Sequence, residues 1–163
     1  MSSQVLSDQS LGVQAFVALL RAHANTTRQL NAQLIADHGL TMADYDVLLH
    51  LAWAPDRRLR RVDIADRVLL TASGVTRLLD GLERGGLVDR GSCDGDRRVV
   101  YAVLTDSGLA KLREAAETHV PQVEAFLSER FDDGELADLR AYLGRIVESE
   151  SAADCGPPTD PSL

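Results

Sequence analysis

Apolar residues recur every three or four positions along most of the chain, and this period is typical of amphipathic α-helices. In the first run, Phe16, Leu20 and Leu30 belong to one apolar stripe. The predicted helices cover residues 10–36, the segment from Thr41 to Pro55, residues 62–69, residues 71–84, and two segments between residues 105 and 148. The chain is therefore predicted to be mainly α, with six helices.

Polar residues and glycines mark several ends of these helices. Thr71 and Thr105 are predicted N-caps, because a threonine hydroxyl accepts a hydrogen bond from a free backbone N–H in the first helical turn. Asp132 and Glu135 have the spacing of a capping box. The pair Gly85-Gly86 is expected to end the helix that begins after Thr71.

After the two glycines the period of the apolar positions changes to that of β-strands. Two short strands are predicted, at Leu87-Val88 and at Val99, Tyr101 and Val103. Between them lies the polar segment Gly91 to Arg98, in which Asp94-Gly95 is a turn signal. This part of the chain is predicted to be a small β-hairpin.

A short helix, a tight turn, a second helix and a β-hairpin thus follow one another between about residues 42 and 104. This is the order of a winged helix-turn-helix, in which the second helix lies in the major groove of DNA and its first residues reach the base edges. The apolar stripe through Val75 and Leu79 leaves the opposite face of this helix outward. The predicted base-reading residues are Ser73, Gly74, Thr76 and Arg77, of which Arg77 suits bidentate pairing with guanine.

The hairpin, or wing, carries Asp96, Arg97 and Arg98 near its tip. An arginine there suits the narrow and electronegative minor groove, so Arg97 and Arg98 are predicted DNA contacts, and Asp96 is predicted to orient an arginine. Arg60 and Arg61 precede the short helix. For these two residues, contact with the phosphate backbone and a purely solubilising role both stay open.

The formal net charge of −8 alone disfavours nucleic-acid binding, because cationic residues that neutralise phosphates supply most of the non-specific affinity. The distribution of charge changes this picture. Residues 57–98 hold ten arginines and seven acidic residues, whereas the rest of the chain holds seven basic and eighteen acidic residues. A locally basic middle flanked by acidic ends is compatible with a DNA-reading module on a scaffold that stays soluble and releases DNA readily.

No stretch reaches the roughly 20 uncharged apolar residues of a membrane-spanning helix, and the first residues lack the basic start and apolar run of a signal peptide. Cys93 and Cys155 are too few for a disulfide framework, and the four histidines lack zinc-site spacing. We therefore expect a cytoplasmic protein with no membrane contact, metal or cofactor. The final segment, residues 149–163, is predicted to be a disordered tail, because it holds three prolines and no periodicity.

The sequence disfavours two other classes of function. A winged-helix module can instead bind a protein partner, because fold does not determine function, but such a helix is expected to expose an apolar or aromatic anchor. The outward face here has serine, threonine and arginine. An enzyme is not expected, because the chain has no glycine-rich phosphate loop, GxSxG elbow or metal-ligand cluster.

Residues 60–108 resemble the MarR (multiple antibiotic resistance) family of regulators. The most specific parts are SGVTRLLDGLERGGLV, residues 73–88, and the wing pattern Asp-x-Arg followed by a strand that ends in Leu-Thr. Asp96, Arg98, Leu104 and Thr105 match this wing pattern.

The resemblance implies a single domain over residues 10–148 that forms an obligate, intertwined homodimer. Residues 10–36 and 105–148 would be the dimerisation helices, and residues 42–104 the winged helix-turn-helix. The apolar stripes of the first and last helices support a partner surface independently. The resemblance further implies a palindromic double-stranded DNA operator, usually repression of nearby genes, and release by a small aromatic or otherwise lipophilic effector.

His23, Tyr45 and Trp53 are candidate ligand contacts. His23 lies on a helix that would border the family's ligand pocket, and the rings of Tyr45 and Trp53 suit stacking on an aromatic effector. A structural role is the alternative for all three. Cys93 in the wing suggests oxidation as a switch, but its acidic neighbour Asp94 disfavours a reactive thiolate.

Overall fold

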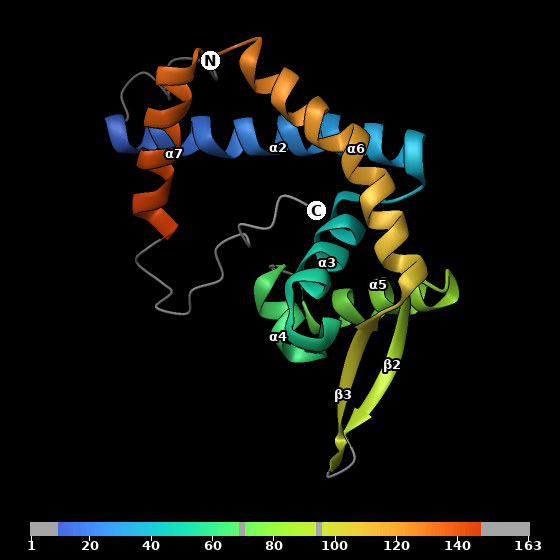
Figure 1. The fold of residues 1–163 in the computed structure, drawn as a ribbon. Helices are drawn as coiled ribbons and strands as arrows, with labels where there is room; N and C mark the ends of the chain where they lie inside the picture. Colours follow the sequence, from blue (N-terminus) through green and yellow to red (C-terminus); the bar gives the residue numbers. More distant parts are fainter. Residues whose placement is uncertain (1–9, 69–70, 94–95, 148–163) are drawn as a thin grey trace, which may run out of the picture. The chain divides into compact units, whose positions relative to one another are not determined.

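The computed structural model describes residues 10–68, 71–93 and 96–147, and Figure 1 labels most of its elements. Six α-helices, one 3₁₀-helix and three β-strands lie in this part of the chain. The chain divides into two compact units, residues 1–42 and residues 43–163. The predicted tail, 149–163, and the predicted Asp94-Gly95 turn lie outside the described residues.

The first unit contains one long helix, α2 (Leu11–His38). It ends at Gly39, whose φ of +68° favours glycine and whose backbone N–H donates to the carbonyl oxygen of Ile35 at 3.0 Å. Beyond the helix, the backbone N–H of Met42 donates to Oδ1 of Asn31 at 2.9 Å. The predicted end of the helix near Gly39 is confirmed.

The second unit holds a helical core and a small sheet. Its elements in chain order are α3 (Met42–Trp53), the 3₁₀-helix η1 (Pro55–Arg57), β1 (Arg58–Arg60), α4 (Arg61–Arg67), α5 (Ala72–Arg84), β2 (Val88–Cys93), β3 (Asp96–Leu104), α6 (Asp106–Ser128) and α7 (Asp133–Val147). Leu48, Ile64, Leu79, Val88 and Leu112 are almost fully buried. These side chains come from α3, α4, α5, β2 and α6, so one apolar core holds the helix-turn-helix and the base of the hairpin.

The three strands form one antiparallel sheet in the order β1-β3-β2. In β1, Leu59 pairs with Ala102 of β3, and both side chains are buried. Sequence analysis missed β1 because a strand of three residues is too short for an alternating pattern and two of its residues are arginines. The strand forms because β3 offers it a ladder and the core receives Leu59.

The hairpin of β2 and β3 is longer than predicted. The polar segment Gly91 to Arg98 was expected to lie between the strands, but β2 continues to Cys93 and β3 begins at Asp96. Backbone pairing continues past the last apolar side chain because ladder hydrogen bonds do not require apolar residues. Figure 1 shows this hairpin extending beyond the helices of its unit, as a wing does.

Three predicted helix caps are confirmed. Oγ1 of Thr71 accepts a hydrogen bond from the backbone N–H of Gly74, and Oγ1 of Thr105 accepts one from Gly108. At the start of α7, the backbone N–H of Asp132 donates to Glu135, whose own N–H donates to Oδ1 of Asp132. These caps begin α5, α6 and α7 where the sequence indicates.

Candidate nucleic-acid interface

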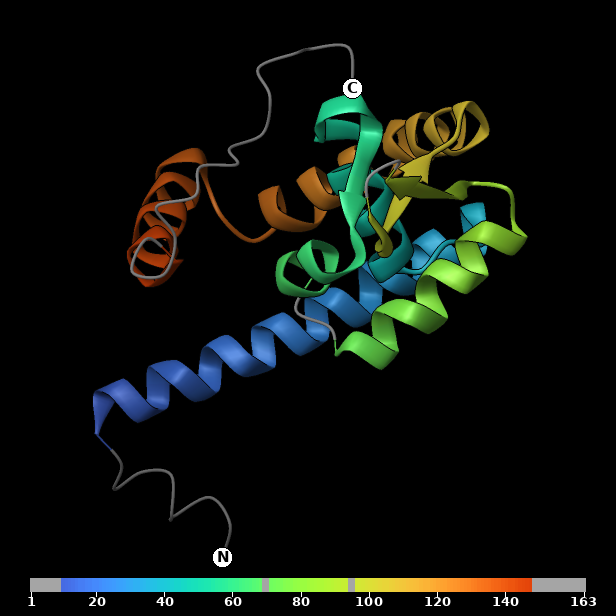
Figure 2. The ribbon, with the colours of Figure 1, turned by 90° about the horizontal axis from the view of Figure 1, so that it is seen from below.

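Helix α5 has one buried face and one exposed face. Val75, Leu79 and Leu82 are between 0% and 4% exposed and pack into the core. On the other side, the predicted base-reading residues Ser73, Thr76 and Arg77 are exposed, and Gly74 is half-buried. Figure 2 shows α4 and α5, both green, beside each other, and contacts between them confirm the helix pair. The structure therefore places the four predicted residues on the accessible first two turns of α5.

The start of α5 is held by local hydrogen bonds. Oγ1 of Thr71 lies 3.2 Å from Oγ of Ser73 and accepts from the backbone N–H of Gly74 at 3.2 Å. In the described part of the chain, Arg77 has no ion-pair partner. Its guanidinium is thus exposed and carries no ion pair with any described residue, and a group that pairs with a base edge needs to be accessible.

Arg60 and Arg61 each form an ion pair with a carboxylate. Arg60 donates from Nε and Nη2 to the two oxygens of Asp63, at 2.8 and 3.0 Å. This hydrogen bonding raises the pKa of Arg60 above its ordinary value. Arg61 donates to Oε1 of Glu83 at 3.1 Å. Their predicted contacts with the phosphate backbone stay predictions.

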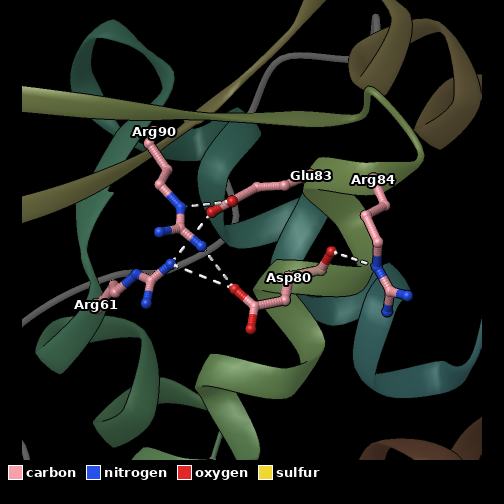
Figure 3. Close-up of polar contacts among 5 residues, drawn as sticks. All are labelled: Arg61, Asp80, Glu83, Arg84 and Arg90. Carbon is pink, nitrogen blue, oxygen red and sulfur yellow. Dashed lines mark hydrogen bonds and ion pairs between the residues drawn. The ribbon is translucent and has the colours of Figure 1, made fainter.

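Arg61 belongs to an ion-pair network that we call the wing-base cluster, formed by Arg61, Asp80, Glu83 and Arg90 (Figure 3). Arg90 donates from Nε to Glu83 at 2.5 Å and from Nη2 to Asp80 at 2.7 Å. The hydrogen bond to Glu83 is the main cause that raises the pKa of Arg90, and attraction by both carboxylates adds to it. The cluster joins α4, α5 and β2.

Sequence analysis did not identify the wing-base cluster. Asp80 and Glu83 are three residues apart, so they lie on one face of α5, and this spacing is the signal in the sequence. The partners were not predictable because Arg90 approaches only through the pairing of β2 with β3. Arg84 also borders the cluster, but its Nε donates to the backbone oxygen of Asp80.

For the wing residues that the sequence singles out, the structure describes the backbone but not the side chains. Arg97 and Arg98 belong to β3, and Asp96 is its first residue. Cys93 is the last residue of β2. The predicted roles of these four side chains therefore stay predictions.

Two of the three candidate ligand contacts lie on α3. Tyr45 is buried, and its ring meets that of the buried His119 on α6 edge-on, with 4.9 Å between centroids. Burial raises the pKa of Tyr45. Trp53 is half-buried, and its ring lies edge-on to that of His50, at 6.0 Å. His23 is exposed on α2, and the structure leaves the ligand-binding roles of all three untested.

His50 also contacts Asp46 one turn earlier on α3, with 3.6 Å between Nε2 and Oδ1. Burial raises the pKa of Asp46, and the nearby imidazole opposes this shift. Among the described residues there is no group of three or more histidine, cysteine or acidic side chains that could hold a metal ion. No described helix is both long enough and apolar enough to span a bilayer.

The helix pair α4–α5, the exposed polar start of α5 and the projecting hairpin define a winged helix-turn-helix. Three helices outside this module, α2, α6 and α7, complete the described part of the chain. Comparison with known proteins gives the same class.

A family model described as MarR family matches residues 38–99. The transcriptional repressor YetL of Bacillus subtilis is 33% identical over 69% of this chain and 67% of its own length. The crystal structure of AbsC, a MarR family transcriptional regulator from Streptomyces coelicolor, is 31% identical, with a TM-score of 0.76 over 86% of this chain and 95% of AbsC. Sco3205 from the same organism, solved in complex with DNA, is 28% identical, with a TM-score of 0.77 over 85% of this chain and 88% of Sco3205. The chain belongs to the MarR family of transcriptional regulators.

Proposed function

We propose that this regulator binds a palindromic DNA operator as a homodimer and represses nearby genes until a small lipophilic or aromatic ligand releases it. The observation that carries the proposal is the exposed face of α5, where Ser73, Thr76 and Arg77 lie opposite the buried Val75 and Leu79. Hydroxyl groups and an arginine at the start of such a helix can hydrogen-bond to base edges in the major groove. That Sco3205 was solved in complex with DNA supports this use of the fold.

The charges around α5 support DNA rather than a protein partner. Residues 57–98 hold three more basic than acidic side chains, in a chain whose net charge is −8. Phosphate attraction would therefore act mainly on this segment, and the acidic remainder would repel DNA. Arg97 and Arg98 are proposed to add a minor-groove contact, with Asp96 orienting an arginine.

The homodimer is supported by apolar side chains that remain exposed on the helices outside the winged module. On α2, Leu11 is 81% and Phe16 58% exposed, and on α7, Ile146 is 60% and Val147 69% exposed. Large apolar side chains repeated along a helix usually face a partner. A two-fold dimer would present its two α5 helices to half-sites about 34 to 36 Å apart, so the operator would be palindromic.

Repression and ligand release are proposed from the family and from the aromatic side chains of α3. YetL is named a repressor. Tyr45 and Trp53 pack against histidines, and Tyr45 reaches α6 through His119. A ligand that inserted among these rings would shift α3 and thereby the helix-turn-helix whose core α3 shares. His23 on α2 is proposed as a ligand contact from the sequence alone. The protein is inferred to act in the cytoplasm, without a cofactor and without catalysis.

Fluorescence anisotropy with labelled duplexes tests DNA recognition. The test duplex is the DNA upstream of the protein's own gene, or the tightest duplex selected from a random library, and the control is a scrambled duplex of equal length. We expect affinity about 1,000-fold above the control, with a steep dependence on salt. Equal and weak binding to test and control duplexes would contradict the proposal and favour a protein-binding role for the winged module.

A further inference from the structure

Sequence reasoning considered Arg61 as a phosphate contact and assigned no role to Arg90, yet both guanidinium groups lie in the wing-base cluster. We propose that this cluster positions the wing relative to α5, with Arg90 as its central positioning residue. The spacing between the two DNA-contacting elements would then be set by an ion-pair network and not by the apolar core alone. The inference rests on the proposed DNA-binding function and assigns positioning residues to it.

The position of Arg90 in the sheet explains why this residue is critical. Arg90 pairs with Ala102, which in turn pairs with Leu59, so the three residues form one row across the sheet. Leu59 and Ala102 are buried, and Arg90 extends from the same row to Asp80 and Glu83 on α5. The next row on this face pairs Ser92 with Val100, and Val100 is already 38% exposed. The row of Arg90 is therefore the last one at which the helices support the hairpin.

Beyond this row the hairpin acts as a lever. Arg98 lies four residues along β3 from Ala102, which corresponds to about 13 Å at the rise of an extended strand. A rotation of roughly 10° at the row of Arg90 would then move the backbone of Arg98 by about 2 Å. A shift of this size breaks a hydrogen bond between protein and DNA, since these bonds weaken steeply beyond their normal length.

The exposure of the cluster indicates positioning rather than stabilisation of the fold. The side chains of Asp80 and Arg90 are 42% and 58% exposed, and those of Arg61 and Glu83 are 22% and 18% exposed. The ion pairs of Arg90, the most exposed member, contribute little to global stability. The core beneath them, which includes Leu79, Leu82 and Val88, is almost fully buried and holds the unit together. Variants of Arg90 should therefore fold normally and differ in how the wing is held.

The charges agree with this role. Arg61 and Arg90 hold Asp80 and Glu83 at distances of 2.5 to 3.9 Å, so the network is neutral as a whole. The two carboxylates would otherwise repel DNA from the second half of α5. Because two carboxylates engage its guanidinium group, Arg90 is proposed to act on DNA binding through the position of the wing.

The first test measures wing position in the free protein. Spin labels are attached to Cys93 on the wing and to Gly81→Cys on α5, where an added Cβ meets nothing within 4 Å, in a Cys155→Ser background. Labelled chains are diluted with unlabelled protein so that intrachain distances dominate. Arg90→Gln is expected to broaden or shift the distance distribution, whereas Arg84→Gln, which removes the same charge from a residue outside the network, should leave it unchanged. A distribution that is the same in Arg90→Gln and the parent would overturn the proposal.

The second test asks whether wing position matters for DNA. Affinity for the selected duplex is measured for Arg98→Ala alone, with Arg90→Gln, and with Arg84→Gln. Suppose that Arg98→Ala weakens binding about tenfold in the parent protein. In the Arg90→Gln background, where the wing is released, the same substitution should weaken binding by only about twofold. In the Arg84→Gln background it should still weaken binding about tenfold. Equal effects of Arg98→Ala in all three backgrounds would overturn the positioning role.

The two tests separate the inference from the function on which it rests. If no duplex binds the parent protein specifically, the proposed function fails, and the spin-label distances still decide whether Arg90 holds the wing. If the parent binds and Arg90→Gln changes neither the distances nor the effect of Arg98→Ala, the inference alone fails.

Discussion

A Cβ atom on Gly108 would lie 2.0 Å from the backbone oxygen of Leu87, so the first turn of α6 packs directly against the chain that leads into β2. Two hydrogen bonds strengthen this contact. The backbone N–H of Thr105 donates to Leu87 at 3.1 Å, and its hydroxyl donates to the backbone oxygen of Gly86 at 2.8 Å. The start of α6, which directly follows β3, is thereby bonded to the residues that lead into β2.

Gly108→Ala is expected to destabilise the protein by at least about 2 kcal/mol, because the added methyl collides with backbone atoms that cannot move without disturbing β2. Gly81 is the matched control, since it is also helical but an added Cβ meets nothing within 4 Å. Gly81→Ala should stabilise the protein by about 0.5 to 1 kcal/mol through helix propensity. Urea unfolding followed by circular dichroism measures both, and equal free energies of unfolding for the two variants would contradict this packing.

Thr105→Ala is expected to lower the free energy of unfolding by about 1 to 2 kcal/mol. The substitution removes the N-cap of α6, in which the hydroxyl accepts from Gly108, and leaves the oxygen of Gly86 without its donor. Thr105→Ser keeps the hydroxyl and should retain most of the stability. Thermal unfolding of the two variants side by side tests the role of the hydroxyl, which a similar loss in Thr105→Ser would exclude.

His50→Gln is expected to raise the pKa of Asp46 further. Burial already raises this pKa above its ordinary value, and the only opposing influence identified for it is the attraction of His50. Carbon-13 NMR of the aspartate carboxyl groups across a pH titration measures the change. A pKa that fell or stayed the same would show that the contact of 3.6 Å carries no electrostatic effect.

The same carboxyl predicts the sign of a pH effect on stability. The pKa of Asp46 is higher in the folded state than its ordinary value of 3.8. Protonation of Asp46 therefore stabilises the folded state, and this stabilisation is complete at pH values below 3.8. The effect is lost as the pH rises through the folded pKa. Asp46→Asn cannot lose a proton, so its free energy of unfolding relative to the parent should increase over this acidic window. Urea unfolding at several pH values across the window provides the measurement.

Local patterns in the sequence predicted most of the helices and their caps. Thr71, Thr105 and the Asp132–Glu135 pair could be identified because capping depends on residues within one helical turn. The buried face of α5 was likewise predictable, since the period of Val75, Leu79 and Leu82 reports directly on it.

The parts that the sequence did not predict depend on contacts between distant segments. Strand β1 forms only because β3, more than 40 residues later, offers Leu59 a partner in Ala102. The wing-base cluster likewise needs the register of β2 on β3 to bring Arg90 to Glu83. Such pairings leave no periodic signal in the separate segments, so only the folded structure reveals them.

Arg77 provides the most direct test of the proposed base-reading face. Arg77→Ala is expected to cost about 1 to 3 kcal/mol of binding free energy toward the selected duplex and to relax the base preference at one position of each half-site. Arg84→Ala is the matched control, because both arginines are exposed on α5 but Arg84 lies at its far end. Loss of Arg84 should weaken binding to selected and scrambled duplexes by the same small factor, as expected for the loss of a general charge. Anisotropy titrations with a set of duplexes, each changed at one base pair, measure the preference. If Arg77→Ala weakens binding to every duplex equally, Arg77 contacts the phosphate backbone, and base reading must be assigned to Ser73 and Thr76.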